Sequence, residues 1–286
     1  MQFYYKKKDS LRPMSGRIID LSQKLSPHTR ELIQVRIKYI NHKSGADDLG
    51  LGIAWKVWEK GFFLTKLYSF LRTAVRGELI RRNQFPGGEG LSMEKVYAMS
   101  HCGTHIDAPA HYGAKLTTID LAPLNLLYDK PGVLIDLQAF QDQEEVGPND
   151  LKQALERINY RLQPEDIVLM KTGMDQYWGT ERYYTRYPGI APAAIEHFLA
   201  LGIKVIGLDT FAVDLPQYGV AKRYWKSKDS SDLWPAHILG RVKPYYIIEN
   251  LCNLHQIPAN SGFRVTALPI KLEAAGAAWA RVVAVV

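Results

Sequence analysis

Short apolar runs alternate with amphipathic stretches through the second half of the chain. The runs at 133–137, 167–171 and 205–208 have the length and β-branched content of buried strands. Between them, the stretches that begin near Pro148 and at 192–201 carry helix start and stop signals. Strand, helix and strand repeats of this length predict an α/β fold, with a mixed or largely parallel sheet covered by helices.

The first third of the chain has a different pattern. Short apolar segments predict strands at 17–21, 33–40 and 93–99, and the sequence NHKSGADDLG after residue 40 is rich in turn-forming residues. From 53 to 82, apolar positions recur at helical spacing and basic residues are frequent. The apolar positions of this segment are Trp55, Trp58, Phe62, Phe63, Leu67, Phe70, Leu71 and Ala74.

Two interpretations of the 53–82 segment are open. Trp and Phe opposed to Lys and Arg are typical of a helix that lies on an anionic membrane surface. Gly61 and Gly77 interrupt the periodicity, which favours inserted helices that pack on the domain, at a subunit interface or over an active site. We therefore predict one domain over residues 1–286, with a helical, basic and aromatic insertion at about 53–85.

Composition limits the class of protein. The chain has 286 residues, 47% hydrophobic, enough for one large core, and its net charge of +7 is spread among acidic residues without a recognised nucleic-acid motif. Two cysteines are too few for a disulfide framework, and the first twenty residues lack the apolar run of a signal peptide. No stretch is long enough to span a bilayer. We expect a cytoplasmic protein that does not bind nucleic acid.

The strongest candidate site lies between Ser100 and His111, which reads SHCGTHIDAPAH. Its four metal-type side chains occupy odd positions and would share one face of an extended segment. A straight strand would hold His101 and Asp107 about 20 Å apart, too far to share an ion, so the segment must bend, and Gly103 and Pro109 suit a bend. Imidazole and carboxylate groups bind borderline divalent cations such as Zn²⁺. The alternative is a polar loop of hydrogen-bonded histidines. The candidate ligands are His101, His105, Asp107 and His111.

Two later stretches carry further chemistry. Asp209 follows an apolar run in GLDTFAVD, at the end of a strand where α/β sheets commonly bind ligands, although a turn with Asx hydrogen bonds is the favoured interpretation. Glu249 lies in the apolar run 245–251, where an ionised carboxylate is costly unless it is paired or bound to metal, and His237 precedes it by twelve residues. A second metal position would require such a pair.

The stretch from His101 to His111 resembles the motif HxGTHxDxPxH of the metal-dependent hydrolases called the cyclase family, which includes bacterial kynurenine formamidases and isatin hydrolases. DLS at Asp20, GLDT at Gly207, the pair His237 and Glu249 followed by NL, and the closing LPIKLEAAGAAWARVVAVV are similar to other landmarks of that family. The resemblance covers nearly the whole chain, and the segment 55–82 is its least typical part.

The resemblance implies a set of roles. His101, His105 and Asp107 would bind a first divalent ion, and Asp107 would bridge to a second, completed by His237 and Glu249. The ions would be Zn or Mn, one or two per chain. The implied fold is α/β, a mixed central β-structure flanked by helices, of the swivelling β/β/α kind, as a homodimer or homotetramer.

The implied reaction is hydrolysis of a small amide, for example an aryl formamide such as N-formylkynurenine, by metal-bound hydroxide, with His111 as the acid/base residue. An alternative is ring-opening of a cyclic amide such as isatin. A non-enzymatic alternative is a basic membrane- or nucleic-acid-associated protein with a structural metal. Phe211 departs from the small residue or proline of many relatives, and together with Trp225, Trp234 and Tyr218 it could form an aromatic substrate pocket.

Overall fold

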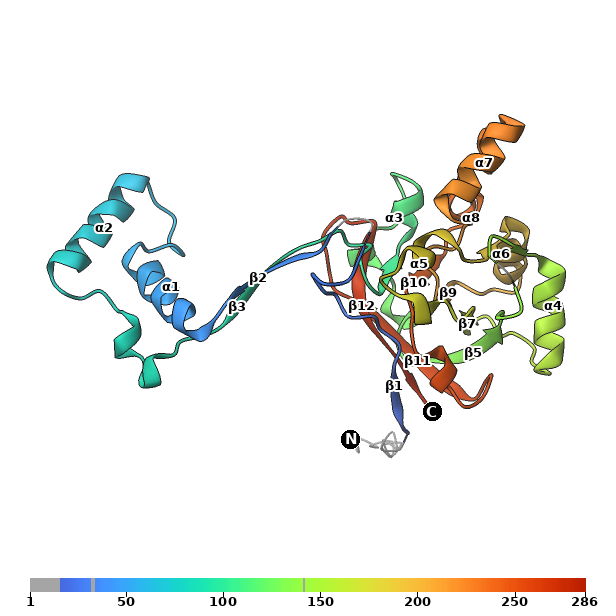
Figure 1. Cartoon of the computed structure of the whole chain (residues 1–286), viewed down its shortest axis with the longest axis horizontal. Helices are drawn as coiled ribbons and strands as arrows, with labels where there is room; N and C mark the ends of the chain where they lie inside the picture. The colour runs from blue at the N-terminus through green and yellow to red at the C-terminus, as the bar shows by residue number, and fades with distance from the viewer. Residues whose placement is uncertain (1–15, 32–33, 141) are drawn as a thin grey trace, which may run out of the picture. The chain divides into compact units, whose positions relative to one another are not determined.

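The computed structural model describes residues 16–31, 34–140 and 142–286. The chain divides into two compact units (Figure 1). The first unit contains the described residues up to Gln34 together with 99–286, and the second contains 35–98. The second unit thus begins earlier and ends later in the sequence than the insertion expected at 53–85. The prediction of one domain over 1–286 stays a prediction.

The first unit is built on a closed, mixed β-sheet. Its strands follow the order β1, β12, β11, β5, β7, β9, β10 and β4, and β4 also pairs with β12, which closes the sheet. Strands β5, β7, β9 and β10 run parallel to their neighbours within this group, and the remaining pairs are antiparallel. The bounds are β1 (Ile18–Asp20), β4 (His105–Asp107), β5 (Lys130–Asp136), β7 (Ile167–Lys171), β9 (Val205–Leu208), β10 (Tyr246–Glu249), β11 (Phe263–Pro269) and β12 (Ala277–Val285).

Alternation along the strands separates two buried cores. On β5, Leu134 belongs to one core and its neighbours Val133 and Ile135 belong to the other. The first core lines the face that the sheet encloses, because every strand of the closed sheet contributes side chains to it. The second core lies between the outer face and the helices. The predicted strands at 133–137, 167–171 and 205–208 are confirmed as β5, β7 and β9.

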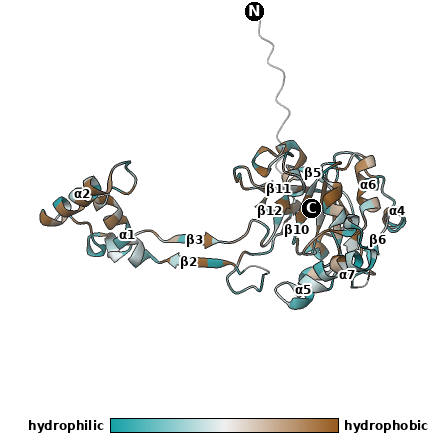
Figure 2. Cartoon of the chain, turned by 90° about the horizontal axis from the view of Figure 1, so that it is seen from above, coloured by the Kyte–Doolittle hydropathy of each residue, from teal (hydrophilic) through white to brown (hydrophobic). Residues whose placement is uncertain are grey.

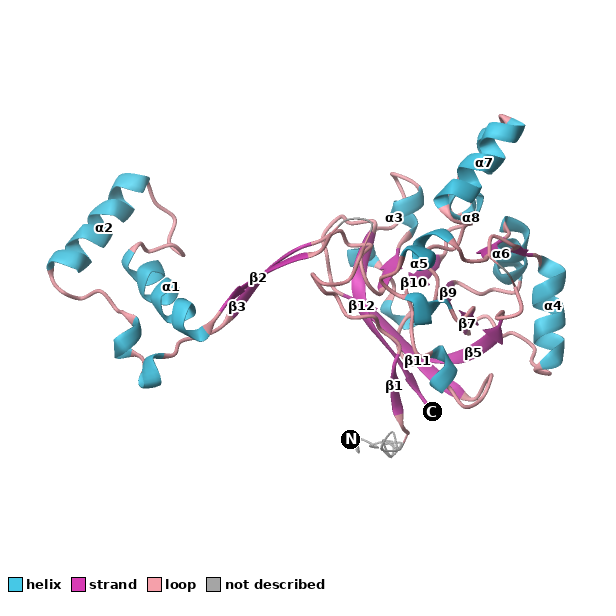
Figure 3. Ribbon diagram, in the orientation of Figure 1, coloured by secondary structure: helices cyan, strands magenta, loops and turns pink. Residues whose placement is uncertain are grey.

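Helices cover the outer face of the parallel strands (Figure 3). Pro148 and Pro192 each occupy the first turn of their helices, where the missing N–H costs nothing. The two helices pack on each other, and the second also contacts α8. The bounds are α3 (Pro109–Tyr112), α4 (Pro148–Arg157), α5 (Glu181–Thr185), α6 (Pro192–Ala200), α7 (Gln217–Ser227) and α8 (Pro235–Leu239). Two short strands, β6 (Glu145–Val146) just before α4 and β8 (Gly189–Ile190) just before α6, form a separate parallel pair.

Short 3-10 turns fill several connections. They are Arg82–Gln84, Pro86–Gly88, Ile119–Leu121, Leu124–Leu126, Met174–Tyr177, Ser230–Asp232 and Leu254–Gln256. The predicted mixed α/β architecture with a central β-structure flanked by helices is confirmed. Among the described residues, no helix combines the length and the apolar character needed to cross a membrane.

The second unit consists of an antiparallel strand pair and two helices. Strands β2 (Arg36–Ile40) and β3 (Met93–Tyr97) pair from Arg36 with Tyr97 to Ile40 with Met93. Helix α1 spans His42–Ala54 and helix α2 spans Phe63–Val75. The breaks expected at Gly61 and Gly77 lie just outside the two ends of α2.

The expectation of a turn at NHKSGADDLG is wrong, because α1 occupies that sequence. The Asn41 side chain caps the helix by accepting a hydrogen bond from the Ser44 amide at 2.9 Å. A Cβ on Gly45 or Gly50 would lie within 2 Å of the backbone oxygens of Leu91 and Ile80, respectively. The glycines that suggest a turn in the sequence therefore form the contact face of a helix. Their close packing outweighs their low helix propensity.

Candidate metal centre

The motif at 101–111 changes backbone direction twice, as the ligand spacing required. Residues 100–104 form a turn in which Gly103 has a φ of +62°, a left-handed conformation that suits glycine. Strand β4 then carries His105 and Asp107, and Pro109 starts the single turn of α3 that carries His111. Turn, strand and helix together bring the distant ends of the motif to one place.

Strand β4 lies between β10 and β12 in the closed sheet. Its register sets His105 opposite Glu249 of β10. Because Ile106 belongs to the enclosed core, the alternating His105 and Asp107 point to the outer, helix-covered side. Glu249 and its neighbour Ile247 share that side of β10, and the carboxylate of Glu249 therefore meets the motif.

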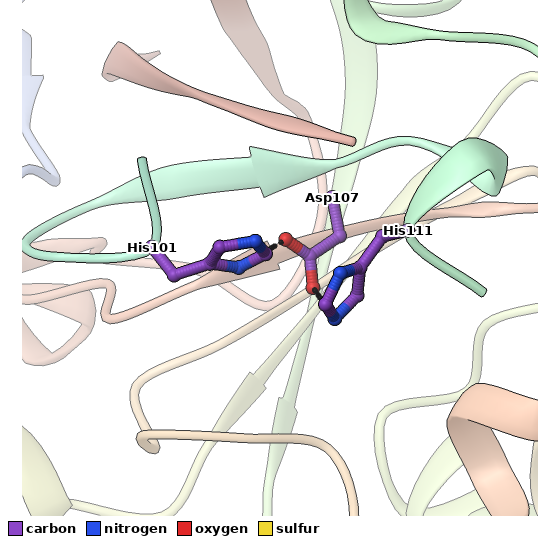
Figure 4. Close-up of side chains that lie close together, drawn as sticks. All are labelled: His101, Asp107 and His111. Carbon is purple, nitrogen blue, oxygen red and sulfur yellow. Dashed lines mark ion pairs between the residues drawn. The ribbon is translucent and has the colours of Figure 1, made fainter. Parts of the chain in front are cut away.

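The Asp107 carboxylate is the centre of the cluster (Figure 4). Its Oδ1 lies 3.0 Å from His101 Nδ1 and 3.3 Å from His105 Nε2. Its Oδ2 lies 3.8 Å from His111 Nε2 and 3.7 Å from His237 Nε2. Four imidazoles thus surround one fully buried carboxylate.

Glu249 completes the cluster from the other side. Its Oε2 lies 3.5 Å from His105 Nε2, and its Oε1 lies 3.7 Å from His237 Nε2. The Val213 amide donates a hydrogen bond to Oε1 at 3.1 Å, which fixes the carboxylate. All six residues selected from the sequence for metal binding or acid/base chemistry therefore lie together: His101, His105, Asp107, His111, His237 and Glu249.

The donor set fits a divalent cation. Among the described residues, His105 Nε2 and both carboxylate oxygens of Asp107 are buried and have no hydrogen-bond partner, although burying such groups unpaired is costly. Donor atoms around a tetrahedral ion at about 2.0–2.1 Å are roughly 3.3 Å apart. Three distances between donor atoms are close to that separation: 3.0 Å from His101 to Asp107, 3.3 Å from His105 to Asp107 and 3.5 Å from His105 to Glu249.

The geometry divides the donors differently from the assignment that the resemblance implied. One group of mutually close donor atoms is His101, Asp107 and His111, and the other is His105, Asp107 and Glu249. Asp107 belongs to both groups, as a bridging ligand would. His111 lies where it could donate to an ion as well as move a proton, so its role stays a prediction.

The pKa shifts within the cluster are those expected of groups that bind either protons or a metal ion. Burial alone would lower the pKa of His105, but the neighbouring Asp107 and Glu249 carboxylates outweigh it and raise that pKa to about 10. Burial would raise the pKa of Asp107, yet the surrounding histidines hold it well below its usual value. A metal ion would take the place of the proton that His105 otherwise retains.

A carbonyl orients the ring of His105. The Gly103 carbonyl lies 2.9 Å from His105 Nδ1 and accepts a hydrogen bond from the side-chain Nδ2 of Asn250 at 2.8 Å. We assign the proton to Nδ1 from this network, which leaves Nε2 as the donor atom that faces Asp107. Tyr183 in turn donates to Asn250 Oδ1 at 2.8 Å. The sequence had marked Asn250 only as the residue after Glu249.

A carboxylate orients the ring of His237. Asp214 is 2% exposed, and its Oδ2 lies 2.6 Å from His237 Nδ1. The same carboxylate accepts hydrogen bonds from the Ala236 amide at 2.7 Å and the His237 amide at 3.1 Å. The sequence places Asp214 in the stretch GLDTFAVD, beyond the strand at 205–208, where it was expected only to contribute to a pocket wall. Its contact with His237 depends on the fold.

The structure does not bring Asp209 to the cluster. Its carboxylate accepts hydrogen bonds from the Thr172 amide and hydroxyl at 2.8 and 2.6 Å and from the Gly173 amide at 2.7 Å. Burial raises the pKa of Asp209 to about 6. Asp209 thus ties the ends of β7 and β9 together, and its part in a substrate pocket stays a prediction.

The residues of the predicted aromatic pocket have different ring partners, and the pocket stays a prediction. The ring of Phe211 packs 5.2 Å from that of Tyr184, in a cluster of tyrosines. Trp225 on α7 is 55% exposed, and its ring lies 6.0 Å from that of Tyr218. Trp234, at the start of α8, is 41% exposed. Aromatic composition alone did not fix which rings meet.

The family model Cyclase, described as "Putative cyclase", matches residues 19–215. The kynurenine formamidase of Sphingopyxis alaskensis is 28% identical over 201 residues, which cover 68% of this chain and 82% of that protein.

Solved structures agree in fold. Isatin hydrolase A from Labrenzia aggregata superposes with a TM-score of 0.68 and 22% identity, covering 94% of this chain and 93% of that one. Isatin hydrolase A from Ralstonia solanacearum superposes with a TM-score of 0.68 and 21% identity, covering 94% and 92%. Since the family model spans well over half of the sequence, the resemblance drawn from the motif is confirmed, and the chain belongs to the cyclase family.

Proposed function

We propose that this protein is a metal-dependent hydrolase of a small, non-peptide amide. The observation that carries the proposal is the buried Asp107 carboxylate, whose two oxygens have no hydrogen-bond partner among the described residues while four imidazoles face them. Membership of the cyclase family supports it. It also opposes the non-enzymatic alternative of a purely structural metal.

One or two divalent ions, Zn or Mn, would be held by His101, His105, Asp107, His237 and Glu249. When bound, such an ion lowers the pKa of a coordinated water and polarises a carbonyl group. The side chains of His105, Asp107 and Glu249 are at most 5% exposed, whereas that of His101 is 26% exposed. A substrate would therefore reach the cluster from the side of His101 and His111.

His111 is the proposed acid/base residue. Its side chain is 36% exposed and its Nε2 lies 3.8 Å from Asp107 Oδ2, at the open side of the cluster. Burial lowers the pKa of His111, with Asp107 opposing the shift, so the ring is neutral near pH 7. A neutral imidazole can accept a proton from the attacking water and return it to the leaving nitrogen.

The proposed substrate is an aryl formamide such as N-formylkynurenine. The similarity to a protein named kynurenine formamidase, over two thirds of this chain, supports this choice. Ring-opening of a cyclic amide such as isatin is the second candidate, favoured by the superposition of isatin hydrolases over 94% of the chain. Both reactions break a C–N bond at a carbonyl and need the same groups.

Side-by-side turnover of N-formylkynurenine and isatin, with metal analysis of the same preparation, tests the proposal. We expect a bound divalent metal and hydrolysis of one of the two amides. Removing the metal with a chelator should abolish that activity, and adding Zn²⁺ or Mn²⁺ should restore it. Metal-free protein that still hydrolyses the amide would refute the proposed mechanism.

Two further predictions accompany the enzyme. We expect a homodimer or homotetramer, which sedimentation velocity of the purified protein would test. We also expect a cytoplasmic location, which fractionation of the source cells would test.

A further inference from the structure

Helix α2 carries two rows of apolar side chains. One row packs within the second unit, and the other is exposed. The ring of Phe70 stacks on that of Trp55 at 4.8 Å, and Leu67 and Ala74 on the same side of the helix are half-buried. The exposed row lies at positions i, i+4, i+7 and i+11, which share one side of a helix. Its members are Leu64, Tyr68, Leu71 and Val75, and they are 73%, 67%, 51% and 88% exposed.

Bulky exposed side chains also occur just before the helix. Phe62, at the N-cap of α2, is 86% exposed, and Trp58 in the preceding loop is 71% exposed. Contiguous apolar surface of this kind marks an interaction site, since scattered single residues are the ordinary case. Figure 2 shows brown, hydrophobic stretches along α2. We call Leu64, Tyr68, Leu71 and Val75 the apolar stripe.

A basic groove borders the apolar stripe. A hollow of about 420 Å³ is lined entirely by residues between 56 and 78, and Tyr68 belongs to both surfaces. Five of its lining residues are basic: Lys56, Lys60, Lys66, Arg72 and Arg76. Lys56 pairs with Glu59 at 3.0 Å, and the other four have no ion-pair partner in the described part of the chain. Arg72 and Arg76 each follow a stripe residue directly, so cationic side chains lie along the edge of the stripe.

We propose that the second unit docks on an anionic phospholipid bilayer, with the apolar stripe at the acyl boundary and the basic groove against lipid phosphates. Apolar and aromatic residues on one side of a helix and Lys and Arg on the other are what such an interfacial helix requires. The two kinds of contact act together, and stable anchoring generally needs two signals.

Charge favours this partner over a second copy of the chain. Residues 35–98 contain eleven Lys and Arg against six Asp and Glu, so they hold +5 of the net +7, and the remainder of the chain holds +2. Pairing of two α2 helices would face like charges, and the rest of a neighbouring copy offers no net negative charge. Each basic residue near an anionic leaflet increases the partition constant of the protein onto the bilayer by about five-fold.

Sedimentation of the full chain with vesicles tests the proposal. We expect binding to vesicles of phosphatidylglycerol and phosphatidylcholine, loss of binding in high salt, and little binding to phosphatidylcholine alone. Leu64→Glu with Val75→Glu should abolish binding. Arg72→Gln with Arg76→Gln should weaken it by about 25-fold, from two factors of about five.

Matched variants in the first unit control for surface changes as such. Leu121→Glu with Leu124→Glu places two acids at residues that are 67% and 60% exposed, and Lys222→Gln with Lys226→Gln on α7 removes two charges. Both controls should bind vesicles almost as the parent does, and amide hydrolysis should be unchanged in the α2 variants.

Several outcomes would overturn the proposal. One is the absence of vesicle binding at low salt. Another is a change of oligomeric state in Leu64→Glu with Val75→Glu without vesicle binding by the parent, which would assign the stripe to a second copy. Binding of glycerol phosphate or duplex DNA without binding of vesicles would assign the groove to a soluble anion or a nucleic acid. Equal vesicle binding by the α2 variants and their controls would remove α2 from the surface.

Discussion

Replacement of Asp214 by Asn tests whether this residue prepares His237 for metal binding. The carboxylate accepts three hydrogen bonds, from the Ala236 amide at 2.7 Å, the His237 amide at 3.1 Å and His237 Nδ1 at 2.6 Å. An amide has one accepting oxygen, so whichever way it is placed at least one buried donor faces an NH₂ group. An unsatisfied buried donor costs about 1–3 kcal/mol in the free energy of unfolding.

Besides this loss of stability, the variant should lose affinity for the metal. Loss of the negative charge behind Nδ1 lowers the basicity of the opposite nitrogen, and removal of such a partner typically weakens metal binding by about 10- to 100-fold. The assay is competition for Zn²⁺ against a chromophoric chelator, combined with urea unfolding of the metal-free protein.

Asp166→Asn is the matched control for a buried carboxylate. Asp166 is also 2% exposed and accepts hydrogen bonds from the Gln163 amide at 2.7 Å and the Tyr160 hydroxyl at 3.3 Å. We expect this variant to lose stability but to keep the metal affinity of the parent. Unchanged metal affinity in Asp214→Asn, or an equal loss in Asp166→Asn, would refute the reasoning.

Three further predictions concern the cluster. His111→Ala should keep the metal content and lower turnover by about two to four orders of magnitude, and loss of metal in elemental analysis would instead make His111 a ligand. Glu249→Gln should lower the number of bound ions, because one oxygen facing His105 or His237 becomes an amide nitrogen, and an unchanged metal-to-protein ratio would exclude Glu249 from binding. Since burial lowers the pKa of His111 and the neutral ring is the base, kcat/KM should fall with decreasing pH through an apparent pKa below 6.5, a limb that should be missing in His111→Ala.

The sequence by itself determined the parts that depend on local pattern. Apolar runs with turn signals on either side predicted β5, β7 and β9, and proline at the start of an amphipathic stretch predicted α4 and α6. The need to place ligands close together predicted a bend within 101–111, and the turn at 100–104 provides it. A buried carboxylate in an apolar run also drew attention to Glu249, because such a group must have a partner.

Only the tertiary structure decided which distant groups meet. The register of β4 against β10 places Glu249 opposite His105, and no local periodicity encodes the pairing of strands that are more than one hundred residues apart. The same holds for Asp214 behind His237 and for Asn250 behind the Gly103 carbonyl, whose roles exist only through long-range hydrogen bonds. Helix α1 makes the point for secondary structure. Its glycines favour a turn locally, and a helix forms because its smooth face packs against the backbone at residues 80 and 91.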